Sequence, residues 1–266
     1  MRLNDQYSAL LAQAVEKRDG FRSQEAYLSH VLQLTSRWRS KLIANTLLER
    51  EGATVLNGPF AGMAYGRFAT AGALAPRLLG SYESELHPTI LGLVGSGLEA
   101  VIDIGCAEGF YAVGLARLLP EVQVHAYDVD PRAREACAEL ARQNGVSDRV
   151  HVGGLFAGAD FARFADRRTL VFIDAEGAEN ELLDPEAFPA LRAMTVIVET
   201  HEHERPGVID RLHARFAASH AIERLDQEPK TTPLPAWISE LGHLDQLLVS
   251  WEWRVFPTPW LVMRPR

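Results

Sequence analysis

Two glycines and a pair of acidic residues stand at spacings that suit the binding of a small organic ligand. The stretch Asp103-x-Gly105-x-x-x-Gly109 ends a predicted strand and opens a predicted helix. Gly105 permits a tight turn after the strand, and Gly109 lacks a Cβ, so a ligand can approach the helix N-terminus closely. The carboxylates of Asp103 and Glu108 would repel a pyrophosphate but suit a ligand with an amino group and positive charge.

A further acid, Asp128, lies at the end of the next predicted strand. A carboxylate at that place can accept hydrogen bonds from both hydroxyls of a ribose. The expected ligand therefore carries a ribose, lacks a phosphate and has a cationic end, and S-adenosylmethionine meets all three demands. A nicotinamide-dependent oxidoreductase is the alternative class, although its dinucleotide loop has the different spacing Gly-x-Gly-x-x-Gly.

Together, Asp103-x-Gly105-x-x-x-Gly109 and Asp128 resemble the cofactor site of class I S-adenosylmethionine-dependent methyltransferases. The later stretch Ile173-Asp174-Ala175-Glu176-Gly177-Ala178-Glu179 resembles the Asp-x-Glu-Gly-x-Glu signature of the FkbM-like branch of these enzymes. The resemblance covers roughly residues 80–225.

The resemblance implies which residues contact the cofactor. The loop at 103–109 would surround the methionine part of the cofactor, and Asp128 would bind the ribose. The chain near Gly154 and Leu155 would lie near the adenine. Tyr82 belongs to a stretch that approaches the methionine end in similar sequences. The full set of implied cofactor contacts is Asp103, Gly105, Ala107, Gly109, Asp128, Val129, Leu155, Asp174 and Tyr82.

Candidate catalytic residues follow the fourth and fifth predicted strands. Methyl transfer mainly requires alignment of the acceptor with the methyl group, and a hydroxyl acceptor also benefits from a base. Asp174, Glu199 and His201 are the candidates, with His201 as the base. We therefore expect transfer to a small-molecule acceptor, at a hydroxyl oxygen. Transfer to nitrogen and a non-catalytic S-adenosylmethionine-binding module are the alternatives.

The same side chains offer a metal-binding alternative. Asp174, Glu199, His201 and His203 could supply oxygen and nitrogen ligands to a divalent ion. The acids of metal-dependent methyltransferases do not recur cleanly in this sequence, so the expectation is a site without metal.

The elements that must position these residues alternate between strand and helix from residue 99 onward. This alternation predicts an α/β fold with a parallel, doubly wound, Rossmann-like sheet. Helical patterns at 3–18 and 24–50, followed by a hairpin or ordered loop at 53–75, predict an N-terminal helical extension. We expect a cap over 1–79 and a catalytic core over 80–266. The core carries an irregular, lid-like insert at 227–257, rich in proline and tryptophan.

Composition and charge narrow the class of protein. The 266 residues carry a net charge of −8, which argues against a protein that coats nucleic acid. Residues 1–75 carry +3, which leaves −11 for the remainder, so a basic cap would accompany an acidic core. No apolar run is long enough to span a membrane. Two cysteines favour free thiols in the cytoplasm. A homodimer through the N-terminal helices is an expected option.

Overall fold

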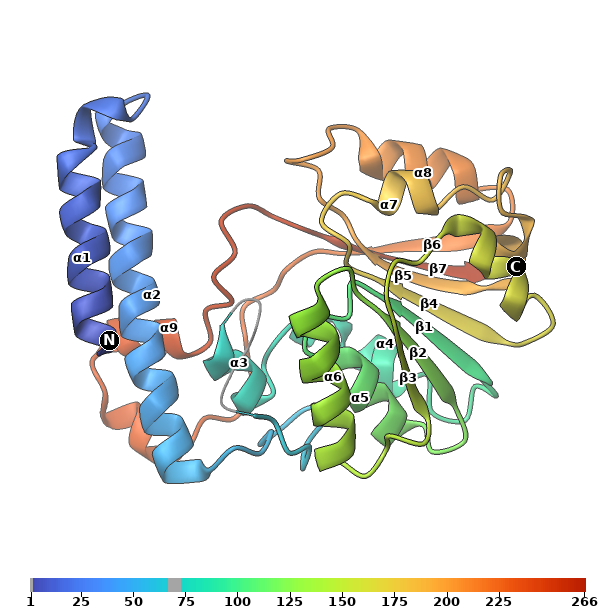
Figure 1. Cartoon of the computed structure of the whole chain (residues 1–266), viewed down its shortest axis with the longest axis horizontal. Coiled ribbons are helices and arrows are strands. Elements are labelled where there is room, and N and C mark those ends of the chain that lie inside the picture. Colours follow the sequence, from blue (N-terminus) through green and yellow to red (C-terminus); the bar gives the residue numbers. More distant parts are fainter. Residues whose placement is uncertain (1, 67–72) are drawn as a thin grey trace.

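A seven-stranded sheet forms the centre of the protein, as shown by a computed structural model that describes residues 2–66 and 73–266 (Figure 1). The strand order is β3-β2-β1-β4-β5-β7-β6. The strands are β1 (Ala100–Ile104), β2 (Gln123–Tyr127), β3 (Val150–Gly153), β4 (Thr169–Ile173), β5 (Thr195–Glu199), β6 (His220–Leu225) and β7 (Trp260–Pro265). Strands β1 to β5 pair in parallel, so the carboxyl ends of β1, β2, β4 and β5 lie at one edge.

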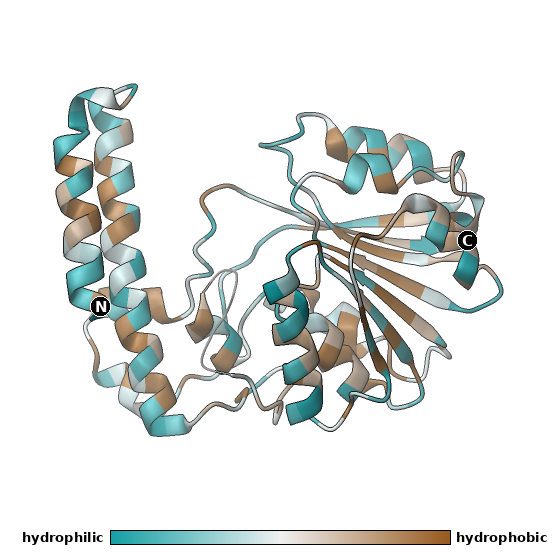
Figure 2. Cartoon of the chain, viewed as in Figure 1, coloured by the Kyte–Doolittle hydropathy of each residue, from teal (hydrophilic) through white to brown (hydrophobic). Residues whose placement is uncertain are grey.

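Helices cover both faces of this sheet, which confirms the doubly wound fold expected from the sequence (Figure 1). One face carries α4 (His87–Leu91), α5 (Phe110–Leu118) and α6 (Pro131–Gln143), and the other carries α7 (Glu179–Leu182) and α8 (Val208–Phe216). Strands β1 and β4 are buried along their whole length. Their nearly continuous apolar sequences suit strands that are covered on both faces (Figure 2).

The expectation of an all-parallel sheet is wrong at one strand. β7 runs antiparallel to both of its neighbours, β5 and β6. The chain leaves β6 at Leu225, passes through the 227–257 segment and turns back to lie beside β6. A strand that returns beside its predecessor in this way pairs antiparallel, whereas parallel pairing requires a crossover to the opposite end of the sheet.

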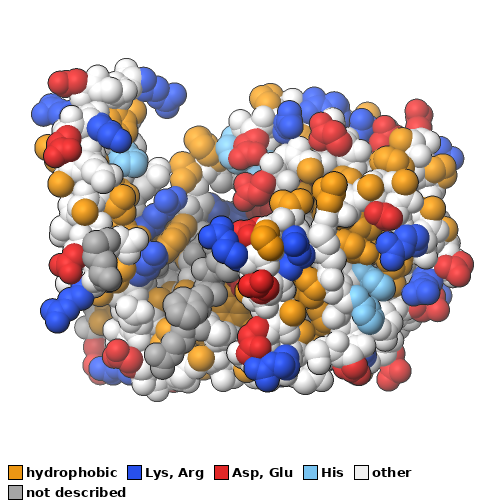
Figure 3. All heavy atoms as spheres, viewed as in Figure 1, with side chains coloured by type: hydrophobic (Ala, Val, Ile, Leu, Met, Phe, Trp, Pro, Cys, Tyr) orange, Lys and Arg blue, Asp and Glu red, His pale blue; other side chains and the backbone are white. Residues whose placement is uncertain are grey.

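Two long N-terminal helices form a hairpin, and most of the hairpin projects away from the core (Figure 1). In the view of Figure 3 an open notch separates the projecting part of the hairpin from the core. The two helices are α1 (Leu3–Glu16) and α2 (Gln24–Glu51), which confirms both predicted helices to within two residues at each end. Ser23 caps α2 by accepting a hydrogen bond from the Ala26 N–H, at 3.1 Å. Gly52 ends the helix with a φ of 82°.

The region after α2 has only part of the predicted hairpin in the described structure. An isolated antiparallel bridge joins Thr54 to Ala64, and α3 (Leu74–Leu79) follows further along the chain. Residues 67–72 of the predicted 53–75 loop lie outside the described residues.

The 227–257 segment is less irregular than expected, since it contains helix α9 (His243–Val249). The segment packs on α2. The Trp237 indole donates to Glu51 at 2.9 Å, and the Trp253 indole donates to the Ser40 hydroxyl at 3.1 Å. Asp245 of α9 pairs with Arg39. These contacts attach the insert to α2 through two of its tryptophans and through Asp245.

In the parts of the chain that the structure describes, none of the helices combines the length and the apolar character needed to cross a membrane.

The C-terminal part of α2 belongs to the main hydrophobic core. A substitution of a buried side chain there tests how strongly the packing of α2 on the core stabilises the fold. Leu47 is fully buried there, whereas Leu32 is 66% exposed. We expect Leu47→Ala to lower the free energy of unfolding by about 2–5 kcal/mol, because it leaves a cavity. Leu32→Ala should change it by no more than about 0.5 kcal/mol. Chemical denaturation measures both, and equal effects would show that α2 does not depend on the core.

Candidate active site

A pocket opens at the carboxyl ends of β1, β2 and β4, where the sequence predicts the cofactor. Its volume is about 410 Å³, which is within the usual range for small-molecule sites. Predicted cofactor contacts contribute much of its wall. The described lining includes Gly105, Ala107, Asp128, Val129, Leu155 and Asp174.

The loop after β1 passes very close to the loop after β4. A Cβ added at Gly105 would lie 1.8 Å from the Asp174 carbonyl oxygen, so this position requires glycine. Gly105 also has a φ of 82°. Ala107, two residues later, has a φ of 46°, which is uncommon for a residue other than glycine. A strained residue of this kind on a pocket wall is typical of a functional loop.

Asp128 connects the loops that follow β1 and β2. Its Oδ2 accepts a hydrogen bond from the Ala107 N–H at 3.0 Å, and its Oδ1 accepts one from the Asp130 N–H at 2.8 Å. Each carboxylate oxygen can accept a further hydrogen bond. The carboxylate is thus fixed at the pocket wall with acceptor capacity left for a ligand.

Two large apolar side chains beside Asp128 are exposed. Val129 is 71% and Leu155 79% exposed, and both line the pocket. Exposed apolar side chains at the rim of a concave site are suited to contact a flat, partly apolar ligand group. Together with the acid of Asp128, these side chains fit the adenosine part of S-adenosylmethionine.

The other three predicted cofactor residues are not among the described residues that line this pocket. Asp103 is buried within β1, and burial raises the pKa of Asp103 to about 7. Gly109 makes room for α6, because a Cβ there would lie 2.7 Å from the Cys137 Sγ. The Tyr82 ring packs against the Arg77 guanidinium, whose central carbon lies 4.3 Å from the ring centroid. Their contacts with the cofactor stay predictions.

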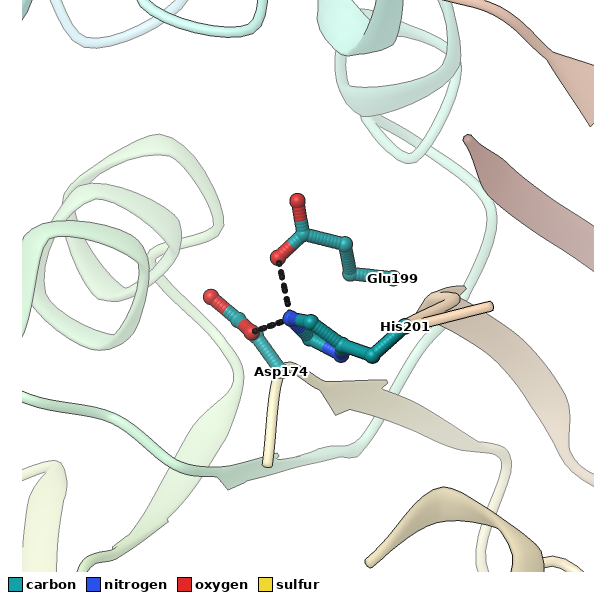
Figure 4. Close-up of side chains that lie close together, drawn as sticks. All are labelled: Asp174, Glu199 and His201. Atoms are coloured by element: carbon teal, nitrogen blue, oxygen red, sulfur yellow. Dashed lines mark ion pairs between the residues drawn. The ribbon is translucent and has the colours of Figure 1, made fainter. Parts of the chain in front are cut away.

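The three candidate catalytic residues do come together (Figure 4). The His201 Nε2 lies 3.6 Å from the Asp174 Oδ1 and 3.6 Å from the Glu199 Oε2. On the other side of the ring, Nδ1 lies 2.9 Å from the Glu179 Oε1, to which it can donate a hydrogen bond. Asp174 faces the pocket, while Glu199 and His201 are buried behind it.

Burial and neighbouring charges perturb all three residues. Burial and the Glu199 charge raise the pKa of Asp174 well above its ordinary value. Burial opposes ionisation of Glu199, but the positive charge of Arg254 and hydrogen bonds from Asp174 and Thr258 together lower the pKa of Glu199 overall. Burial alone would lower the pKa of His201, yet the hydrogen bond with Glu179 and the Glu199 charge raise it overall. Such a set of shifted groups is typical of a functional site.

Sequence reasoning missed Arg254, which supports this cluster from the 227–257 segment. Arg254 forms ion pairs with Glu83, Glu199 and Glu252. Glu252 also accepts a hydrogen bond from the Glu83 N–H at 2.8 Å and pairs with Lys230 at 2.7 Å. These residues are far apart in the sequence, and their spacing carries no motif that could have revealed the network.

His203 does not join the cluster. β5 ends at Glu199 and the chain turns, so the strand alternation that would place His201 and His203 on one face does not persist. The His203 ring instead stacks on Phe256, with 4.9 Å between ring centroids.

Comparison with known proteins gives a family match for the middle of the chain. Residues 89–166 match the family model described as Ribosomal protein L11 methyltransferase (PrmA). A protein of that name from Methylococcus capsulatus is 44% identical over 62 residues, which are 23% of this chain and 21% of the relative. One from Alkalilimnicola ehrlichii is 41% identical over 75 residues, or 26% of this chain and 25% of the relative. The chain thus spans a quarter or less of these relatives' length.

Solved structures with a similar arrangement include two O-methyltransferases. The enzyme from Bacillus cereus, in complex with SAH, is 13% identical, with a TM-score of 0.47 over 85% of this chain and 90% of that one. TomG from Streptomyces achromogenes, in complex with SAM, is 14% identical, with a TM-score of 0.47 over 85% and 89%.

These findings correct the expected partner. The curated relatives are named for a protein acceptor, ribosomal protein L11, so the prediction of a small molecule as the acceptor is wrong.

The matched segment runs from α4 to η3 (Gly158–Phe164), so it contains the glycine loop and Asp128 and ends before Asp174. The matched family is one of methyltransferases, in agreement with the enzyme class expected from the sequence. The chain has the class I S-adenosylmethionine-dependent methyltransferase fold, with an N-terminal helical extension.

Proposed function

We propose that the protein is an S-adenosylmethionine-dependent methyltransferase whose cofactor binds in the pocket at the ends of β1, β2 and β4. The observation that carries this proposal is the position of Asp128, fixed against the Ala107 loop at the pocket wall. The match of residues 89–166 to a methyltransferase family supports it, because that segment supplies both the loop and Asp128.

In this proposal each residue of the pocket contacts one part of the cofactor. Asp128 accepts hydrogen bonds from the ribose hydroxyls, and Val129 and Leu155 flank the adenine. Gly105 and Ala107 lie along the methionine part of the cofactor. Asp174 lies near the sulfur, from which the methyl group leaves.

When bound, the cofactor supplies a methyl group on a cationic sulfur. The chain aligns the acceptor with that methyl group and excludes water, because the leaving group is already good. Asp174 is the member of the cluster that lines the pocket, and Glu199 and His201 hold it from behind. Asp174 therefore contacts the acceptor and Glu199 helps to position Asp174. His201 is the base that receives the proton released by a hydroxyl acceptor.

The acceptor is proposed to belong to a protein, by analogy with the names of the curated relatives. We retain a hydroxyl oxygen as the methylated atom and the FkbM-like branch as the subfamily, on the sequence of residues 173–179. An amine nitrogen is the second candidate, and the surplus of carboxylates around Asp174 favours it because carboxylates attract a cationic amine. Tandem mass spectrometry of the methylated product distinguishes the two, because it locates the added methyl group on a hydroxyl-bearing or on an amine-bearing side chain.

The remaining features of the chain are consistent with this proposal. The division into a cap at 1–79 and a core at 80–266, with 227–257 closing over the site, is retained as part of it. Cys106 and Cys137 are both free and buried, which suits the reducing cytoplasm as the proposed location.

Removal of the ribose acceptor tests the cofactor site. We expect Asp128→Ala to raise the Kd for S-adenosylmethionine by about 10²–10⁴-fold, since it removes two hydrogen bonds to a charged group that contribute about 1.5–3 kcal/mol each. Isothermal titration measures the Kd. Asp148→Ala, at an exposed acid in the turn before β3, serves as the matched control. An unchanged Kd in Asp128→Ala would contradict the role of Asp128 in binding the ribose. Asp128→Asn keeps the shape of the side chain and tests whether loss of its charge alone weakens cofactor binding.

Removal of the buried imidazole tests the catalytic cluster. We expect His201→Ala to lower kcat by about 10²–10⁴-fold, with the Kd for the cofactor unchanged, because the imidazole acts on the acceptor side. His203→Ala removes the neighbouring, more exposed imidazole and should leave kcat unchanged. Transfer of labelled methyl to protein acceptors measures kcat. Full turnover in His201→Ala would exclude the assigned role, and binding without any turnover in the unmodified protein would indicate a non-catalytic module.

A further inference from the structure

Three potential metal ligands converge beside the pocket, and we propose that Asp174, Glu199 and His201 bind a divalent metal ion. One donor atom from each residue lies within 4.8 Å of the others. The His201 Nε2 lies 3.6 Å from each of the two carboxylate oxygens, too far for a hydrogen bond. Ligand atoms on one ion with bonds of about 2.1 Å stand about 3.0–3.4 Å apart, so a shift of a few tenths of an ångström brings Nε2 to that separation from each carboxylate oxygen.

The imidazole is held in the orientation that a metal ligand requires. Its Nδ1 lies 2.9 Å from the Glu179 carboxylate, which is fully buried and also accepts a hydrogen bond from the Gly177 N–H at 3.1 Å. A carboxylate on one ring nitrogen fixes the tautomer and presents the lone pair of the other nitrogen. In His201 that other nitrogen is Nε2, which faces Asp174 and Glu199 (Figure 4).

The two carboxylates also leave donor atoms free for an ion. The Glu199 Oε1 accepts hydrogen bonds from Arg254 and from the Thr258 hydroxyl, which fixes the side chain and leaves Oε2 toward His201. The Asp174 Oδ1 is buried and has no hydrogen-bond partner among the described residues. A buried carboxylate oxygen without a partner is costly, and a metal bond would remove that cost.

Charge around the cluster favours a cation. Six carboxylates converge here, whereas Arg254 and Lys230 are the permanent cations paired with them in the described structure. The six are Glu83, Glu85, Asp174, Glu179, Glu199 and Glu252. Five of them are nearly buried, and buried negative charge is unfavourable unless it is compensated. A dication compensates two of these charges.

The donor set indicates the kind of ion. One imidazole nitrogen and two carboxylate oxygens suit Zn²⁺ or Mn²⁺, while Mg²⁺ prefers oxygen ligands alone. The Asp174 side chain is 35% exposed and lines the pocket, so the open coordination positions would lie on the side of the acceptor. Binding of the ion stands on the geometry alone. Its role, which is to lower the pKa of a coordinated hydroxyl acceptor, rests on the proposed methyl transfer. With the ion bound, His201 is a ligand in place of its role as base, and the acceptor proton leaves to water.

Mn²⁺ binding to the full chain tests the site. The protein is dialysed against a chelator and titrated with Mn²⁺, and electron paramagnetic resonance measures the free ion. We expect one saturable site per chain, displaced by Zn²⁺, with a spin-echo signal from one coordinated imidazole nitrogen. His201→Ala should abolish the nitrogen signal, and Glu179→Gln should weaken binding by about 10–100-fold through the orienting carboxylate.

His203→Ala and Glu204→Gln form the matched control, because this neighbouring His–Glu pair lies outside the three-ligand cluster. Both should bind Mn²⁺ as the unmodified protein does. Absence of saturable binding in the unmodified protein would overturn the proposal without recourse to any variant. An unchanged nitrogen signal in folded His201→Ala would overturn it too, since the ion would then bind elsewhere.

Titration of the same samples with S-adenosylmethionine separates this proposal from the function. Cofactor binding without Mn²⁺ binding removes the metal site and leaves the methyltransferase proposal standing. Mn²⁺ binding without cofactor binding leaves the metal site standing and removes the methyltransferase proposal, together with the role of the ion in it.

Discussion

The close approach of two strand-end loops is the constraint on which the site depends. β1 lies between β2 and β4 in parallel register, so the chain leaves three neighbouring strands at one edge of the sheet. At that edge the missing Cβ of Gly105 lets the β1 loop pass against the Asp174 carbonyl. This contact brings Asp128, proposed to bind the cofactor, and Asp174, proposed to face the acceptor, into one pocket.

A buried ionic network then ties distant parts of the chain to the pocket. Arg254 joins the end of β5 at Glu199 to the segment before the core at Glu83. The same 227–257 segment holds α2 through Trp253 and Asp245. The N-terminal hairpin is therefore attached to the element that also supports the Asp174–Glu199–His201 cluster. Buried ion pairs of this kind contribute less to stability than to one specific arrangement of their partners.

Much of the fold could be predicted from the sequence, because the strands of a doubly wound sheet are short apolar runs separated by amphipathic helices. The glycine loop and Asp128 were found for a local reason, since their spacing fixes their geometry within one strand–loop–helix unit. The direction of β7 was missed because it depends on a long return connection. Arg254 was missed as a partner of the site because its contact with Glu199 exists only in the folded chain.

In the proposed function, one pocket binds the cofactor and directs its methyl group toward Asp174. A crystal structure of the full chain grown with S-adenosylhomocysteine tests this most directly. The account predicts that the ribose hydroxyls lie within hydrogen-bond distance of the Asp128 carboxylate and that the sulfur faces Asp174. Binding of the ligand away from Asp128, or with its sulfur directed away from the Asp174–Glu199–His201 cluster, would contradict the account.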